Sequence, residues 1–280
     1  MSSGARRAPP ATTAQDALQY DSVVVPRYSG LFAQLIVDEI LPGTRATVLD
    51  VGCGSGTPAF DVLRRLTEGG RVIAIDPDAT LVDLARRRAA GGEDGRRIFF
   101  KCESANELHF GDEVFDIVVG NLALGALDAP VAMPEMRRVL VPGGRILLTQ
   151  AMSGSFEEAL DVLREIAAKN DSPTIAQRIE SVAQRYPTRA EMARLAESTG
   201  FQDVRLREQS FRLSFRSARD LFVDPLMRLI GIPEWRFIAG FEPGGEKILE
   251  QMERTLDTYF GGGPLSLTVN AGLLAARRAL

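Results

Sequence analysis

Short apolar runs alternate with amphipathic stretches along the first half of the chain. Five runs rich in β-branched or other apolar residues predict strands, and they lie at residues 46–51, 72–75, 98–102, 115–119 and 145–150. Between them the apolar positions recur at helical spacing, as in residues 79–90. Strands that are apolar throughout and separated by helices are typical of a parallel sheet covered on both faces. The pattern therefore predicts an α/β protein.

The alternation is interrupted twice in the second half of the chain. Helical amphipathicity and irregular segments occupy residues 151–187 and 216–264, and strands are predicted again at 204–215 and 265–275. We therefore predict seven strands, mostly parallel, with helical insertions after the fifth and the sixth. The predicted divisions are a disordered arm (1–19), a core with an N-terminal cover helix (20–150), a helical lid (151–187), a continuation of the core (188–215), a second lid (216–264) and a final strand (265–280).

Composition and charge exclude several classes of function. The 280 residues are 45% hydrophobic and 25% charged, as in ordinary globular proteins. The net charge is −4 and basic residues alternate with acidic ones, so no basic patch for nucleic acid is predicted. No run approaches the roughly 18 apolar residues of a membrane span, and no apolar segment follows Arg6 and Arg7 to make a secretory signal. Two cysteines and one histidine cannot build a usual zinc site. We expect a cytoplasmic protein without a metal, a nucleic-acid partner or an integral membrane segment. Its oligomeric state is not predicted.

The most informative motif is a glycine-rich turn between the first strand and the following helix. Glycines stand at positions 52, 54 and 56, and glycine lets backbone approach a ligand closely. Such a turn at the carboxyl end of a parallel strand is the usual ligand position in an open α/β sheet. Asp76 ends the second strand about 20 residues later, where a carboxylate can accept both hydroxyls of a ribose. The motif therefore predicts a nucleoside-binding site.

Two details separate this turn from the dinucleotide fingerprint. That fingerprint requires its third glycine at position 57, which is Thr57 here. Asp50 precedes the first glycine by two residues, and its carboxylate would repel a pyrophosphate but suits a cationic amino group. A nicotinamide-dependent oxidoreductase is therefore the less favoured alternative.

Five motifs in register carry a resemblance to a known family. The segments are 50–56, 75–77, 103–110, 115–121 and 135–144. In this order they resemble the motifs of class I S-adenosylmethionine-dependent methyltransferases, in particular the ubiquinone/menaquinone-biosynthesis-like (type 11) group. The resemblance implies a Rossmann-like fold, S-adenosyl-L-methionine as cofactor, and methyl transfer to an oxygen, carbon or nitrogen of a small, largely apolar acceptor such as a secondary metabolite or a quinone-like molecule. A noncatalytic binding protein of the same fold and a peripheral enzyme acting on lipids stay open as alternatives.

The resemblance also implies a set of residues that contact the cofactor: Tyr28, Asp50, Gly52, Cys53, Gly54, Gly56, Asp76, Pro77, Ser104, Ala105, Asn121 and Leu122. Two departures from the family pattern matter. Ser104 replaces the acid that commonly accepts the adenine amino group, and Gly125 stands where relatives often have a histidine. No catalytic base is therefore predicted, and Tyr20, Tyr28, Tyr186 and Asp128 are left as open candidates. Large side chains between Phe222 and Phe241, Trp235 among them, are expected to line the acceptor pocket.

Overall fold

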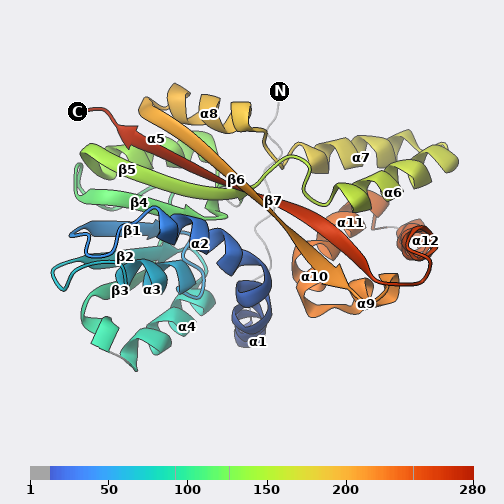
Figure 1. The fold of residues 1–280 in the computed structure, drawn as a ribbon, viewed down its shortest axis with the longest axis horizontal. Coiled ribbons are helices and arrows are strands. Elements are labelled where there is room, and N and C mark those ends of the chain that lie inside the picture. Colours follow the sequence, from blue (N-terminus) through green and yellow to red (C-terminus); the bar gives the residue numbers. More distant parts are fainter. Residues whose placement is uncertain (1–12, 92, 126, 242) are drawn as a thin grey trace.

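A seven-stranded sheet forms the centre of the molecule in the computed structural model, which describes residues 13–91, 93–125, 127–241 and 243–280 (Figure 1). Its strand order is β3-β2-β1-β4-β5-β7-β6. The strands are β1 (Thr47–Val51), β2 (Arg71–Asp76), β3 (Ile98–Cys102), β4 (Phe115–Asn121), β5 (Leu140–Ala151), β6 (Phe201–Phe215) and β7 (Leu265–Arg278). All neighbours pair in parallel except β7, which runs antiparallel to both β5 and β6. The predicted fold class is confirmed.

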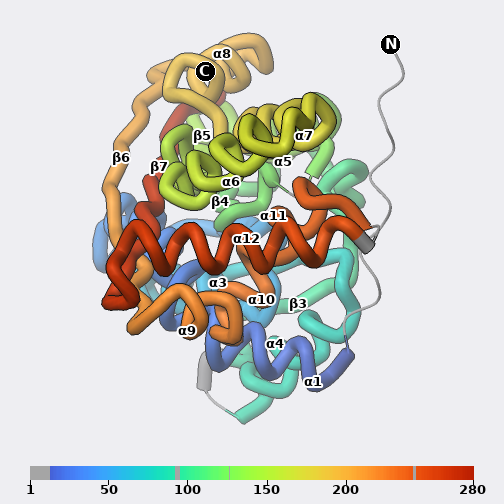
Figure 2. The backbone as a smooth tube through the Cα atoms, turned by 90° about the vertical axis from the view of Figure 1, so that its right-hand side faces the viewer, coloured from blue at the N-terminus to red at the C-terminus, as the bar shows by residue number. Residues whose placement is uncertain are grey.

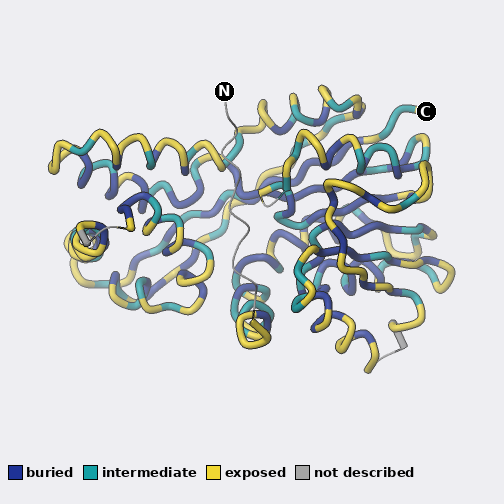
Figure 3. Tube along the Cα trace, turned by 180° about the vertical axis from the view of Figure 1, so that it is seen from behind, coloured by how far each residue is buried: buried dark blue, intermediate teal, exposed yellow. Residues whose placement is uncertain are grey.

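Helices cover both faces of the sheet. One face carries α2 (Gly30–Asp38), α3 (Thr57–Leu63) and α4 (Ala79–Ala90), and the other carries α5 (Ala129–Val139) and α8 (Arg189–Ser198). The central strands are buried along nearly their whole length while the outer faces of the helices are exposed (Figure 3). This burial on both faces explains why these strands are continuously apolar in sequence.

The carboxyl half of the chain adds a second group of helices beside the sheet. It consists of α6 (Glu157–Lys169) and α7 (Pro173–Ala183), which precede α8, and α9 (Ala218–Val223), α10 (Pro225–Ile230), α11 (Ile232–Ala239) and α12 (Pro243–Tyr259), which lie between β6 and β7. The long strands β6 and β7 run from the sheet into this group (Figure 1), and α12 crosses its outer side (Figure 2). Large apolar side chains fill its interior, among them Leu163, Ile179, Trp235 and Met252.

The expected disordered arm is wrong for its last residues. Residues 14–19 form helix α1 (Ala14–Gln19), and residues 1–12 lie outside the part of the chain that the structure describes. Thr13 caps this helix: its hydroxyl accepts a hydrogen bond from the Asp16 backbone N–H, and the Asp16 carboxylate accepts one from the Thr13 backbone N–H. Ala17 is buried against the rest of the protein. The short capping motif and this tertiary contact order a segment whose composition predicts disorder.

The chain then continues into a π-helical segment, Tyr20–Ser29, which leads directly into α2. Two further short turns of 3₁₀-helix occur at Glu93–Arg96 and Ala123–Gly125. Within the described residues, no helix has the length and apolar character required to cross a membrane.

Candidate functional site

The glycine-rich turn has a left-handed backbone, which glycine adopts readily. Gly52, Gly54 and Gly56 all have positive φ, and Gly56 caps the amino end of α3. The N–H groups of Gly52 and Cys53 donate hydrogen bonds to the Ile75 carbonyl at 2.8 and 3.0 Å. These bonds tie the turn to the end of β2, at the point where the strand order reverses between β1 and β4. This is the ligand position of open α/β sheets.

Asp76 lies at the carboxyl end of β2 and faces the same turn. One carboxylate oxygen accepts a hydrogen bond from the Gly54 N–H, and the other accepts one from the Asp78 N–H, both at 2.9 Å. Asp76 is 8% exposed, and this burial raises its pKa above the ordinary value despite the two hydrogen bonds. The carboxylate is thus held rigidly beside the glycine turn.

Asp50 is fully buried beneath the turn, and neither of its carboxylate oxygens has a hydrogen-bond partner among the described residues. Burial, followed by the charge of Asp76, raises the pKa of Asp50 to about 8. The Ala59 backbone N–H opposes this rise in part, although it does not meet the geometry of a hydrogen bond. A buried carboxyl without partners costs free energy unless another group compensates it. This arrangement fits a cationic group bound nearby, because such a group would favour the ionised form.

The π-helical segment Tyr20–Ser29 lies directly over the turn. A Cβ atom on Gly54 would be 3.8 Å from the Tyr20 ring, and the Asp21 carboxylate accepts a hydrogen bond from the Ser55 hydroxyl at 2.6 Å. Arg88 of α4 donates to both Asp21 and the Ser55 carbonyl, at 2.7 and 2.9 Å. The space left between the segment and the turn is about 20 Å³, which is room for about one water molecule. A nucleoside could enter only if the segment shifts.

The other side of the small cavity is formed by Asn121 at the end of β4. Its amide donates to the Ser29 carbonyl at 2.9 Å and accepts a hydrogen bond from the Thr149 hydroxyl at 2.7 Å. Thr149 lies on the neighbouring strand β5, in register with Asn121. The Asn121 side chain therefore links the two strand ends to the covering segment.

The predicted adenine side of the site is more open. Pro77 and Ser104 are exposed, whereas Ala105 is buried after the end of β3. The Ser104 hydroxyl accepts only a weak hydrogen bond, from the Asn106 N–H at 3.3 Å. Glu103, one residue earlier, is 8% exposed and pairs with Lys101 and with the His109 N–H.

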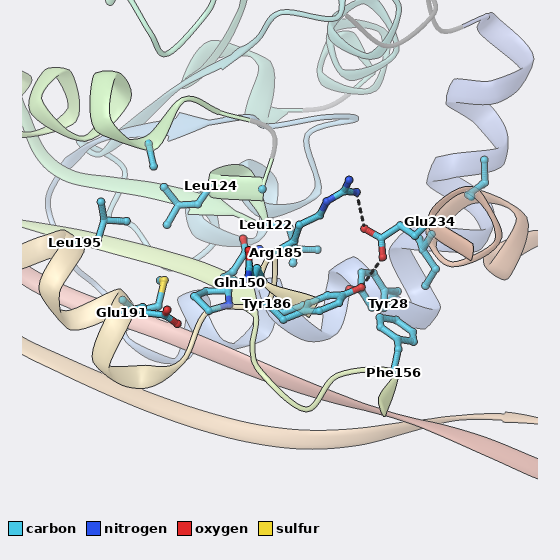
Figure 4. A pocket seen from close by; sticks show the side chains of 18 residues that line it. Tyr28, Leu122, Leu124, Gln150, Phe156, Arg185, Tyr186, Glu191, Leu195 and Glu234 are labelled. Carbon is cyan, nitrogen blue, oxygen red and sulfur yellow. Dashed lines mark hydrogen bonds and ion pairs between the residues drawn. The ribbon is translucent and has the colours of Figure 1, made fainter. Parts of the chain in front are cut away.

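A second cavity of about 680 Å³ opens next to the carboxyl ends of β4 and β5, between the sheet and the second group of helices (Figure 4). Its walls are mixed, with apolar side chains beside two glutamines, two glutamates and one arginine. Three aromatic rings, of Tyr28, Phe156 and Tyr186, follow one another along one side with centroids 6.4 and 6.0 Å apart. Its apolar lining includes Leu122, Leu124, Met192, Leu195, Leu229 and Ile230. Such a cavity with a few polar groups is typical of a small-molecule site.

Three of the polar side chains that line the cavity are linked by hydrogen bonds. The Tyr186 hydroxyl donates to the Glu234 carboxylate at 2.7 Å, and Arg185 donates to the same carboxylate at 3.3 Å (Figure 4). Burial and the charge of Glu234 raise the pKa of Tyr186 well above its ordinary value. Tyr186 therefore stays protonated as a hydrogen-bond donor, and its acceptor is Glu234, a residue that no local sequence pattern indicates.

The structure brings most of the predicted residues together and places some of them elsewhere. Tyr28 lines the large cavity, whereas Tyr20 contacts the glycine turn. Cys53 is buried in the turn, and this burial raises the pKa of its thiol well above the usual range, which disfavours the nucleophilic thiolate. The prediction that Trp235 lines the cavity is wrong. Trp235 is 2% exposed, and its ring centroid lies 5.8 Å from that of Phe222 inside the second group of helices. Helical spacing alone does not distinguish a core position from a cavity wall.

No group of three or more side chains able to hold a metal gathers among the described residues. A metal-independent reaction stays a prediction of the sequence.

Comparison with known proteins agrees with this site. Residues 48–144 match the family described as "Methyltransferase domain", and this range contains the glycine turn, Asp76 and Asn121. The chain is 32% identical over 153 residues to a malonyl-[acyl-carrier protein] O-methyltransferase of Herminiimonas arsenicoxydans, with 54% of each chain covered. It is 28% identical over 178 residues to the ubiquinone/menaquinone biosynthesis C-methyltransferase UbiE of Geobacter sulfurreducens, covering 60% of this chain and 69% of that protein. This chain therefore spans only about half of the length of the malonyl-[acyl-carrier protein] O-methyltransferase.

A solved structure shares the fold over nearly the whole chain. Phosphoethanolamine N-methyltransferase 2 of Haemonchus contortus, solved with S-adenosyl-L-methionine, superposes with a TM-score of 0.57 at 19% identity. The superposition covers 96% of this chain and 58% of that one, so it includes the second group of helices.

Proposed function

We propose that this chain, whose residues 48–144 match the methyltransferase-domain family, transfers the methyl group of S-adenosyl-L-methionine to a small, largely apolar acceptor. The attacking atom would be oxygen, carbon or nitrogen. The relatives support this range, since one is named an O-methyltransferase and another a C-methyltransferase. A cytoplasmic location and the lack of a nucleic-acid partner stay predictions of the sequence.

The adjacency of the two cavities is the observation that carries the proposal. Ser29 and Asn121 line the small cavity at the glycine turn, while the residues next to them in sequence, Tyr28 and Leu122, line the large cavity. A molecule in the large cavity would therefore lie only about one residue's width from a ligand on the turn. Group transfer between two bound molecules requires this proximity.

The residues at the turn fit S-adenosylmethionine. Asp76 would accept the ribose hydroxyls, and the buried, unpartnered Asp50 would favour the cationic end of the amino-acid part. Ser104 and Ala105 would border the adenine, and Gly52, Gly54 and Gly56 would allow close approach of the backbone. Cys53, Pro77, Asn121, Leu122 and Tyr28 complete the proposed contact set. When bound, this cofactor supplies a methyl group on a positively charged sulfur.

The remaining task of the chain is to position the acceptor and exclude water. The apolar part of the cavity wall would hold the acceptor beside Leu122, and helices α6, α7 and α9–α12 would form the lids that close over it. Holding two reactants in line is worth up to about 7–11 kcal/mol of the barrier, and a good leaving group on sulfur requires little further help. Positioning is therefore the main catalytic contribution that we propose for the chain.

Calorimetric titration tests the cofactor assignment. We expect S-adenosylhomocysteine to bind with micromolar affinity, about −8 kcal/mol, and NAD to show no heat of binding. Binding of NAD alone would favour the oxidoreductase alternative. Incubation with methyl-labelled S-adenosylmethionine and a small-metabolite extract should transfer label to the organic phase. Cofactor binding without any labelled product would favour the noncatalytic alternative.

A further inference from the structure

Gln150 lines the large cavity, and one polar atom of its side chain is buried without a partner among the described residues. It lies near the carboxyl end of β5 and is 8% exposed, and its Oε1 atom is buried without a hydrogen-bond partner among the described residues. A buried amide oxygen without a partner is destabilising, and such groups are rare in folded proteins. A ligand with an O–H or N–H group would remove this cost.

The position of Gln150 places its amide beside the proposed transfer point. The preceding residue, Thr149, donates the hydrogen bond that holds Asn121, and Leu122 lies in the wall of the same cavity. A Cβ atom on Gly125 would be 3.4 Å from Nε2 and 3.7 Å from Oε1 of Gln150. A side chain at position 125 would therefore begin in van der Waals contact with the Gln150 amide.

The charges around the cavity disfavour an anionic acceptor. Arg185 is the one Lys, Arg or His side chain among the described residues that line it, and that cation is already engaged. It pairs with the Glu234 carboxylate and lies 5.2 Å from the centre of the Phe237 ring. A phosphate in this cavity would lack an available cation and would meet the carboxylate of Glu234.

We propose that Oε1 of Gln150 accepts a hydrogen bond from an O–H or N–H group of the acceptor, and that Gln150 thereby selects uncharged, donor-bearing acceptors. This inference rests on the proposed function, because it assigns the large cavity to the acceptor. Gln150 acts as a positioning residue, since it fixes the orientation of the donor group beside the cofactor side of the cavity. The same contact discriminates against molecules in which that group is methylated or phosphorylated.

Three probes of one shape test the selection by calorimetry in the presence of S-adenosylhomocysteine: 2-naphthol, 2-methoxynaphthalene and 2-naphthyl phosphate. We expect the wild-type chain to bind 2-naphthol roughly fivefold more tightly than 2-methoxynaphthalene, as one hydrogen bond provides, and the phosphate most weakly. This ranking requires no variant. Equal binding of the first two probes, or tightest binding of the phosphate, would overturn the proposal.

Two matched variants then locate the effect. Gln150→Leu should bring the ratio of the first two affinities close to one, whereas Gln184→Leu, the same substitution at an exposed glutamine on the cavity rim, should keep it. An unchanged ratio in Gln150→Leu, or an equal loss in Gln184→Leu, would refute the role of the buried amide. Titration of the wild-type chain with S-adenosylhomocysteine and the methyl-transfer assay report separately on the proposed function. A wild-type chain that binds no S-adenosylhomocysteine, or that transfers no methyl group, would contradict the proposed function whatever the ratio of the probe affinities.

Discussion

Asp21 fastens the covering segment to the glycine turn through the Ser55 hydroxyl, with 2.6 Å between the two oxygen atoms. Arg88 reinforces this contact from α4, and the side chains of Asp21 and Arg88 are only about one third exposed, at 28% and 36%. The entrance to the proposed cofactor site is thus closed by a small number of polar contacts. Such contacts can open without unfolding the core.

The first prediction follows from this closure. Asp21→Ala should release the segment Tyr20–Ser29 and raise the association rate of S-adenosylhomocysteine about fivefold, since one or two hydrogen bonds no longer oppose opening. Stopped-flow binding and amide hydrogen exchange of residues 20–29 measure the two effects. Asp83→Ala is the control, because Asp83 also pairs with an arginine of α4 but at an exposed site. Unchanged association and exchange in Asp21→Ala would show that these contacts do not control entry.

The second prediction concerns Asp76. Asp76→Ala should weaken S-adenosylhomocysteine binding at least about tenfold, because the ribose would lose a charged acceptor and the Gly54 N–H its partner. Asp78→Ala is the matched control: it removes the side-chain cap of α4 and should cost about 1 kcal/mol of stability without this loss of affinity. Calorimetric titration and urea unfolding of both variants provide the comparison. If both folded variants bind S-adenosylhomocysteine equally well, Asp76 does not contact this ligand.

The third prediction is a pH dependence of stability. The pKa of Asp50 is about 8 in the folded chain and near the ordinary 3.8 when unfolded, so the folded state binds more protons between these values. Stability should therefore fall as pH rises from about 4 to 8, by up to about 1.4 kcal/mol per pH unit. Asp50→Asn should reduce this slope, and the raised pKa of Asp76 should preserve part of it.

Urea unfolding at pH 5, 6, 7 and 8 measures the slope. The exposed Asp83→Asn should leave the slope as in the wild-type chain. If the slope is the same with and without the Asp50 carboxyl, that carboxyl is not protonated in the folded state near neutral pH.

The fourth prediction separates the core of the helical group from the cavity wall. Trp235→Ala should cost about 3–5 kcal/mol of unfolding free energy, because it leaves a large void at a residue that is 2% exposed. Leu229→Ala, at a residue that is 37% exposed and lines the cavity, should cost less than half as much and weaken 2-naphthol binding. Urea unfolding and calorimetry measure both. A Trp235→Ala variant that is as stable as the wild-type chain but binds 2-naphthol more weakly would show that Trp235 lines the cavity.

The sequence alone determined the parts of this protein that depend on local chemistry. Strand and helix positions follow from the period of apolar residues, and the glycine turn follows from backbone conformations that only glycine adopts readily. The sequence predicts Asp50 in the site because it comes two residues before that turn, and Asp76 because it ends the second strand about 20 residues later. Parallel strands then bring their carboxyl ends to one edge, so the cofactor side of the site could be placed without a structure.

Only the tertiary structure decided which side chains meet across long separations. Tyr186 and Glu234 are 48 residues apart, and Arg27 and Asp224, which form a bidentate ion pair between the covering segment and α10, are 197 apart. Helical periodicity shows that Trp235 faces an apolar interior but not whether that interior is solid or hollow. The cavity and its unpartnered Gln150 oxygen arise from how packed elements leave space between them, and packing is a property of the whole fold rather than of any local pattern.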